Sequence, residues 1–152
     1  MNTQQIEKKL LENEYTSKYF IGVFAADQLP LEKIDQEVWL LVCNCCPMNM
    51  PGEHWIALFG NARQEVEMFD SFGLSPNVYD GVHQFIRAQE PVTISYNTYQ
   101  LQSLESDACG PYCLYYTHYR SLGFTMEAIV ENIAEDMNRD DFIKFIVENV
   151  LY

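Results

Sequence analysis

The chain has 152 residues, of which 48% are hydrophobic and 14% aromatic, and its formal net charge is −13 at pH 7. This length and apolar content predict one folded domain over residues 1–152 and exclude a disordered chain. The negative charge repels phosphate backbones and no apolar run is long enough to cross a bilayer, so we expect neither a nucleic-acid nor a membrane partner.

The first third of the chain predicts one helix and two strands. Residues 4–14 place apolar side chains three and four positions apart, which indicates a short amphipathic helix. Residues 19–24 and 38–45 are runs of aliphatic and aromatic side chains, which are typical of buried strands. Two prolines and a glycine predict a loop over residues 46–52.

Two further apolar segments, on either side of residues 60–64, predict a β-hairpin. These segments are residues 54–59 and 65–70. A five-residue loop would set Phe59 opposite Glu65 and His54 opposite Asp70, with the last pair on one face because side chains alternate along a strand. Directly opposed residues have β-carbons about 5 Å apart, so the Asp70 carboxylate could orient the His54 ring. A loop one residue longer or shorter would separate them.

The second half of the chain predicts one strand among helices. Residues 92–101 have the composition of a strand. Helical patterns cover residues 77–88, 109–121, 125–135 and 140–150. Strands in the middle of the chain and helices towards its ends indicate an α+β fold.

Cys109 is expected at the exposed N-terminal end of the helix over residues 109–121. Pro111 is tolerated only in the first turn of a helix, so the helix must begin near Cys109. Ser106 and Asp107 are candidate N-caps. A thiol at this position ionises more readily, because a helix N-terminus presents N–H groups and a partial positive charge.

Cys109, His54, Asp70 and Gln102 together form the residue set of a cysteine protease. His54 would activate the thiol of Cys109 and Asp70 would orient the imidazole. The amide of Gln102 could add a donor that stabilises an oxyanion. For the histidine and aspartate alone, a structural hydrogen bond at a sheet edge is an equal alternative, but the cysteine and the glutamine favour catalysis.

The five cysteines come without a secretion signal, so we expect reduced thiols. Cys43, Cys45 and Cys46, with His54, could in principle ligate zinc. However, strand alternation points Cys46 away from the other two cysteines. We therefore expect no metal and no cofactor.

The chemistry-bearing residues occur in an order that resembles the adenovirus protease (adenain) family, with its relatives in large DNA transposons and viruses. A more distant resemblance is to the SUMO-deconjugating proteases. The likeness covers about residues 15–123 and depends on four motifs, His54-Trp55, Phe69-Asp70-Ser71-Phe72-Gly73, Gln102 and Cys109-Gly110.

This resemblance implies a papain-like fold, with a mixed central sheet flanked by helices, and a thiol endopeptidase activity. Cys109 would attack the peptide carbonyl, His54 would shuttle the proton, and Gln102 with the backbone N–H of Cys109 would hold the oxyanion. We expect the substrate to be bound by Gly52, Glu53, Trp55 and Gly110. Relatives cut after small residues, in Gly-Gly or Gly-X-Gly sites, because a narrow tunnel excludes side chains.

The resemblance also implies protein substrates, either viral or transposon precursor proteins or ubiquitin-like conjugates, and a location in the virion or in the nucleus or cytoplasm of an infected cell. The segment at residues 91–96 lacks the cysteine through which the adenovirus enzyme binds its activating peptide. The charge also argues against activation by DNA, so we expect a protease independent of both activators. Two alternatives remain open: a YopJ-type acetyltransferase, and a non-catalytic module that binds a ubiquitin-like tail or a capsid protein.

Overall fold

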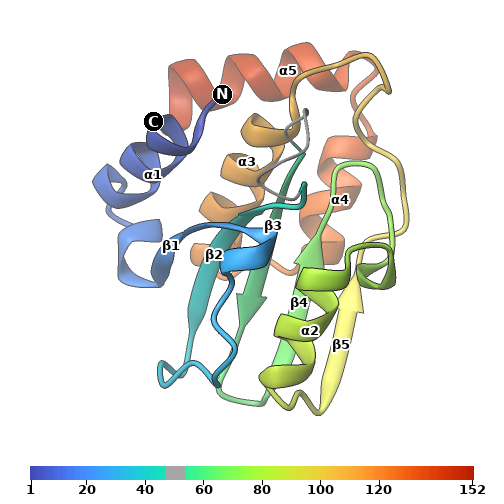
Figure 1. The fold of residues 1–152 in the computed structure, drawn as a ribbon. Helices are drawn as coiled ribbons and strands as arrows, with labels where there is room; N and C mark the ends of the chain where they lie inside the picture. The colour runs from blue at the N-terminus through green and yellow to red at the C-terminus, as the bar shows by residue number, and fades with distance from the viewer. Residues whose placement is uncertain (47–53) are drawn as a thin grey trace.

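The computed structural model describes residues 1–46 and 54–152, which build one mixed five-stranded sheet with the order β1-β2-β3-β4-β5 (Figure 1). Strand β1 is parallel to β2, and β5 is parallel to β4, whereas β2, β3 and β4 are antiparallel neighbours. The strand bounds are Phe20–Ala25 for β1, Trp39–Asn44 for β2, Trp55–Gly60 for β3, Glu65–Phe69 for β4 and Thr93–Tyr96 for β5.

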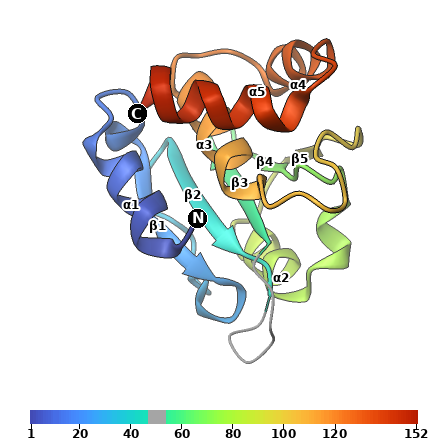
Figure 2. The ribbon, with the colours of Figure 1, turned by 90° about the horizontal axis from the view of Figure 1, so that it is seen from above.

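Helices cover both faces of this sheet. Helix α2 lies on one face, and α3, α4 and α5 lie on the other, with α1 beside the β1 edge (Figures 1 and 2). The α-helix bounds are Thr3–Glu12 for α1, Asp80–Ala88 for α2, Cys109–Ser121 for α3, Met126–Ala134 for α4 and Arg139–Ile146 for α5. Short 3-10 turns lie at Thr16–Lys18, Ala26–Gln28 and Pro76–Val78, and a π-helical turn at Val147–Leu151 continues α5. The expected α+β class, with a mixed sheet flanked by helices, is confirmed.

Side chains alternate along the central strands and pack into two separate hydrophobic cores, one on each face of the sheet. Leu40 and Val42 of β2 pack in the core formed with α1, α3, α4 and α5. Leu41 and Cys43 of the same strand point the other way and pack in the core formed with α2. Burial on both faces explains why this strand is apolar along nearly its whole length.

The predicted strand over residues 92–101 is shorter in the structure, because its second half hydrogen-bonds the turn that follows β4. β5 ends at Tyr96, and the next residue, Asn97, turns its side-chain amide onto the backbone N–H and carbonyl of Asp70 at 2.9 and 2.6 Å. Leu101 then donates its backbone N–H to the carbonyl of Ser71 at 2.9 Å. The segment is therefore fastened to the end of β4 and does not extend the sheet.

The hairpin register differs from the predicted one by two residues. Leu58 faces Met68 and Gly60 faces Val66, so the predicted pairing of Phe59 with Glu65 is wrong. The reason is a tighter turn, in which the side chain of Asn61 accepts hydrogen bonds from the backbone N–H groups of residues 63 and 65 and residue 64 adopts a left-handed φ of 57°. This register does not set Asp70 directly opposite His54, so that predicted pairing is wrong as well. A shift of two nevertheless keeps the parity of each strand, so the two residues still belong to one face.

Gly60 leaves room for a large aromatic ring on the neighbouring strand. It lies opposite Trp39 in the ladder between β2 and β3. A β-carbon added at this glycine would overlap the indole of Trp39, which is buried and packs edge-to-face on Phe85. The packing of Trp39 in the core beneath α2 therefore requires a glycine at this position.

We predict that Gly60→Ala lowers the free energy of unfolding by about 2 kcal/mol, because the added methyl overpacks the site. The check is urea denaturation followed by tryptophan fluorescence and by circular dichroism. In a Trp39→Leu background the same substitution should cost almost nothing, because the ring that it meets is gone. An equal cost in both backgrounds would contradict this explanation.

Candidate active site

Cys109 is the first residue of α3, as the position of Pro111 predicted. The expected exposure is wrong, because the side chain packs in the core on this face of the sheet and is buried. The expected caps are wrong, because Ala108 is the N-cap residue and its side chain makes no capping hydrogen bond. Ser106 instead accepts the backbone N–H of Ala108 at 3.1 Å, and Asp107 points outward to the Nζ of Lys144 at 2.6 Å. The start of the helix is therefore shaped by the preceding loop.

The structure brings Cys109, His54 and Asp70 together where three elements meet. His54 directly precedes β3, Asp70 directly follows β4, and Cys109 opens α3. Nε2 of His54 lies 2.8 Å from Oδ1 of Asp70, whose side chain is completely buried. The imidazole also hydrogen-bonds the Cys109 thiol. With Nε2 held by the carboxylate, Nδ1 is the ring nitrogen that faces the sulfur.

The protonation of this pair is shifted towards a thiolate and an imidazolium. Burial opposes both charges, but the hydrogen bonds with Asp70 and Cys109 outweigh it and raise the pKa of His54 to about 9. Burial likewise disfavours the Cys109 thiolate. The hydrogen bond with His54 and the backbone N–H groups of Trp55 and Gly110 overcome this and lower the thiol pKa below its ordinary value. An ion pair at rest is the state from which a thiol can act as a nucleophile.

Several contacts that the sequence did not predict hold Asp70 in place. Tyr79 donates its hydroxyl to Oδ2 at 2.8 Å, and the backbone N–H of Phe72 donates to Oδ1 at 2.8 Å. Asn97 bonds the backbone of Asp70 on both sides. The ring of Phe72 stacks on the imidazole of His54, with centroids 4.6 Å apart. Except for Phe72 in the aspartate turn, these residues come from segments whose proximity no local pattern indicates.

Gln102 and Cys109 line one small cavity of about 190 Å³, together with His54 and Trp55. Gln102 is nearly fully buried, and its Nε2 donates to the carbonyl of Ser106 at 2.7 Å. Cys109, the first residue of α3, forms part of the cavity wall. It is a space of the size that a small side chain or a peptide group can enter.

The residues expected to bind substrate have different positions. Trp55 lines the cavity, but its indole is only 2% exposed and Nε1 donates to the carbonyl of Met1 at 3.2 Å. Gly110 is buried, and a β-carbon there would lie 3.2 Å from Cβ of Met1. Gly52 and Glu53 lie outside the described residues.

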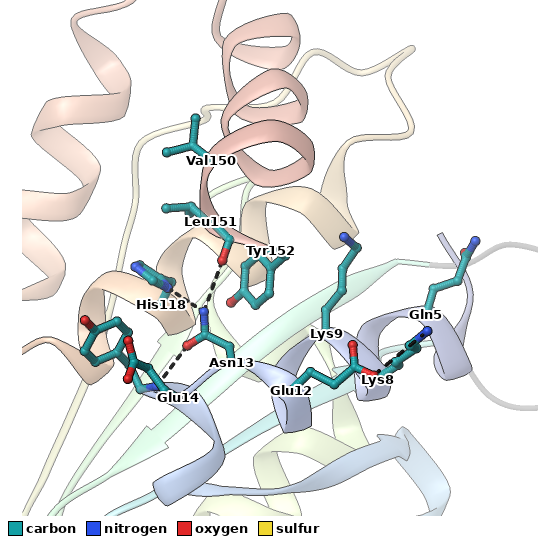
Figure 3. Close-up of a pocket in the computed structure, with 11 residues that line it drawn as sticks. Gln5, Lys8, Lys9, Glu12, Asn13, Glu14, His118, Val150, Leu151 and Tyr152 are labelled. Carbon is teal, nitrogen blue, oxygen red and sulfur yellow. Dashed lines mark hydrogen bonds and ion pairs between the residues drawn. The ribbon is translucent and has the colours of Figure 1, made fainter.

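A larger cavity, of about 770 Å³, lies away from this chemistry, between α1 and the residues that follow α5 (Figure 3). Asn13 spans it by donating to Nδ1 of His118 at 3.2 Å and to the carbonyl of Leu151 at 3.1 Å. Burial lowers the pKa of His118, which leaves this histidine neutral at pH 7. The residues that line this cavity include no cysteine, serine or threonine.

Two negative findings apply to residues 1–46 and 54–152. No helix there has the length and apolar character needed to cross a membrane. In the same part of the chain, no three side chains of histidine, cysteine, aspartate or glutamate are grouped so that they could hold a metal ion.

The fold is shared with known structures, although no family model matches the chain. The central domain of the uncharacterized Lpg1148 protein from Legionella pneumophila is similar over 97% of this chain and 93% of that one, with a TM-score of 0.56 and 14% sequence identity. The ASFV pS273R protease is similar over 73% of this chain, with a TM-score of 0.49 and 23% identity. The match spans 43% of the length of that protease. At 14% identity, the likeness to the Legionella domain establishes a common fold and leaves activity to the residues of the site.

We predict that Cys109 titrates below the ordinary thiol value of 9 in the native protein, because His54 stabilises its thiolate. In His54→Ala the apparent pKa of the thiol should rise, since the charge partner is lost while the burial remains. The check is the pH dependence of alkylation by iodoacetamide, read at Cys109 by mass spectrometry.

The matched control is His118→Ala, which removes a buried histidine in the larger cavity and should leave the titration unchanged. Cys113, fully buried with a raised pKa, should stay unmodified in the folded protein. A Cys109 titration that is identical with and without the imidazole of His54 would contradict the ion pair.

Proposed function

We propose that this protein is a cysteine endopeptidase of the adenain type, with Cys109 as nucleophile, His54 as general base and acid, and Asp70 as the group that orients the imidazole. One observation carries the proposal: a thiol at a helix N-terminus is hydrogen-bonded to a histidine whose other ring nitrogen lies 2.8 Å from a fully buried carboxylate. A structural hydrogen bond between His54 and Asp70 would not need the thiol.

The reaction follows from these positions. The thiolate of Cys109 attacks the carbonyl carbon of the scissile peptide, and the electron pair of the C=O bond moves to oxygen. The N–H groups of Gln102 and of the Cys109 backbone are the donors for this oxyanion. When the C–N bond breaks, the imidazolium of His54 gives its proton to the departing amine. Water, deprotonated by His54, then hydrolyses the thioester and restores the thiol.

The cavity beside Cys109 measures about 190 Å³ and has the buried indole of Trp55 as one wall. For this position we propose a preference for small residues at the cut site. The motif order His-Trp, F-D-x-F-G, Gln and Cys-Gly supports the same specificity by its resemblance to proteases that cut at Gly-Gly or Gly-X-Gly. We therefore propose glycine-containing precursor proteins as substrates, of the viral or transposon kind, with ubiquitin-like conjugates as the related substrate class.

We predict that a peptide library is cleaved by the wild-type protein with glycine enriched at the cut site, and that Cys109→Ala and His54→Ala lose this cleavage. The measurement is mass spectrometry of the digested library, together with labelling by a vinyl sulfone probe that ends in glycine. Cleavage that persists in Cys109→Ala would refute the proposal. Transfer of an acetyl group from acetyl-CoA to Cys109, without peptide cleavage, would favour the acetyltransferase instead.

We also predict a bell-shaped pH dependence of kcat/KM. The active ion pair exists above the lowered pKa of Cys109 and below the pKa of His54, so activity should rise through the first and fall as the pH passes about 9. In Asp70→Asn the alkaline limb should move to lower pH, because the negative charge that stabilises the imidazolium is removed.

The matched control is Glu67→Gln, which neutralises a carboxylate bonded to Arg120 at 2.8 Å, away from the site. It should leave both limbs in place. An alkaline limb that does not respond to the loss of the Asp70 charge would contradict the role of this residue.

A further inference from the structure

The amide group of Gln102 is held by contacts at both of its ends. Nε2 donates to the carbonyl of Ser106 at 2.7 Å, and Oε1 accepts the hydroxyl proton of Ser71 at 2.6 Å. A peptide carbonyl can only accept, so Ser106 selects the nitrogen. In a flipped amide, two oxygens would face each other at this position, which is unfavourable in a buried site.

Ser71 reaches Gln102 through its backbone as well as its hydroxyl. Its carbonyl accepts the backbone N–H groups of Leu101 and Gln102 at 2.9 and 3.0 Å. The serine itself is only 1% exposed, and it follows Asp70 directly in the chain. The turn after β4 and the segment before α3 are therefore fastened to each other at the residue that carries the amide.

We propose that Ser71 is a positioning residue, whose hydroxyl keeps an N–H of Gln102 directed at the oxyanion. The inference rests on the proposed function, in which Gln102 is an oxyanion donor. The amide nitrogen carries two hydrogens; Ser106 takes one, and the second is the donor for the substrate. Without the hydroxyl of Ser71, Oε1 loses its donor in a buried place, and the amide gains orientations that turn its oxygen towards the negative charge.

The turn after β4, which carries Asp70 and Ser71, thereby contacts both parts of the proposed catalytic site. Asp70 acts on the proton-transfer half through His54, and Ser71 acts on the charge-stabilising half through Gln102. Removing the Ser71 hydroxyl should affect only the second half, because it makes no bond to the carboxylate or the imidazole. This separation makes the inference testable.

The experiment compares wild type with Ser71→Ala in two reactions of Cys109. Binding of a peptide aldehyde that ends in glycine, which forms a tetrahedral adduct, should weaken about tenfold, and kcat should fall by a similar factor at unchanged KM. Alkylation by iodoacetamide should keep its rate and pH profile, because it develops no oxyanion. Ser121→Ala is the matched control: it removes a hydroxyl bonded to the carbonyl of Thr117 at 2.7 Å in α3 and should change neither reaction.

A double-mutant cycle with Gln102→Ala gives the decisive readout. If Ser71 acts through the amide, Ser71→Ala adds no further loss of aldehyde affinity once the amide is absent. An additive loss in that background, unchanged aldehyde affinity in the single variant, or an equal fall in the alkylation rate would each overturn the inference. A wild-type protein that neither cleaves peptides nor binds the aldehyde would refute the proposed function itself, and the role of Ser71 with it.

Discussion

The site depends on one buried carboxylate. Asp70 is completely removed from solvent, and a charge in such a place is tolerated only when hydrogen bonds replace the water that it has lost. Three donors do so: the imidazole of His54 and the backbone N–H of Phe72 at Oδ1, and the hydroxyl of Tyr79 at Oδ2. Each bond also limits how the carboxylate can rotate. The contacts that compensate the desolvation of Asp70 therefore also fix the orientation of the imidazole.

The sheet supplies the frame for this arrangement. Antiparallel pairing of β3 with β4 places the start of one strand and the end of the other at the same edge, which sets His54 beside Asp70. Helix α3 packs on the same sheet through a core that includes Cys109 itself, so the thiol arrives at that edge as part of a buried element. Groups on rigid elements lose little conformational freedom when a reaction begins, which the proposed roles of His54 and Cys109 require.

The turn after β4 links the chemistry to the rest of the molecule. It ends the strand, carries Asp70 and, in the next residue, bonds the segment that carries Gln102. Asn97, just beyond β5, closes the arrangement by bonding the backbone of Asp70. The overall fold is shared with the Legionella domain at 14% identity. The contacts around Asp70, in contrast, are made by particular side chains and do not follow from the fold alone.

Local patterns in the chain were enough to place most helices and strands to within a few residues, except for the end of β5. The start of α3 at Cys109 followed from Pro111, because proline restricts a helix locally. Parity along two strands was also enough to put His54 and Asp70 on one face. The hairpin register was not accessible in this way, since the bonds of the Asn61 side chain tightened the turn by two residues. The contacts of Tyr79, Asn97 and Ser71 were not predicted, although Ser71 belongs to the aspartate motif. Their partners lie up to 31 residues away, and such contacts arise only when the folded chain brings distant polar groups into a space from which water is excluded.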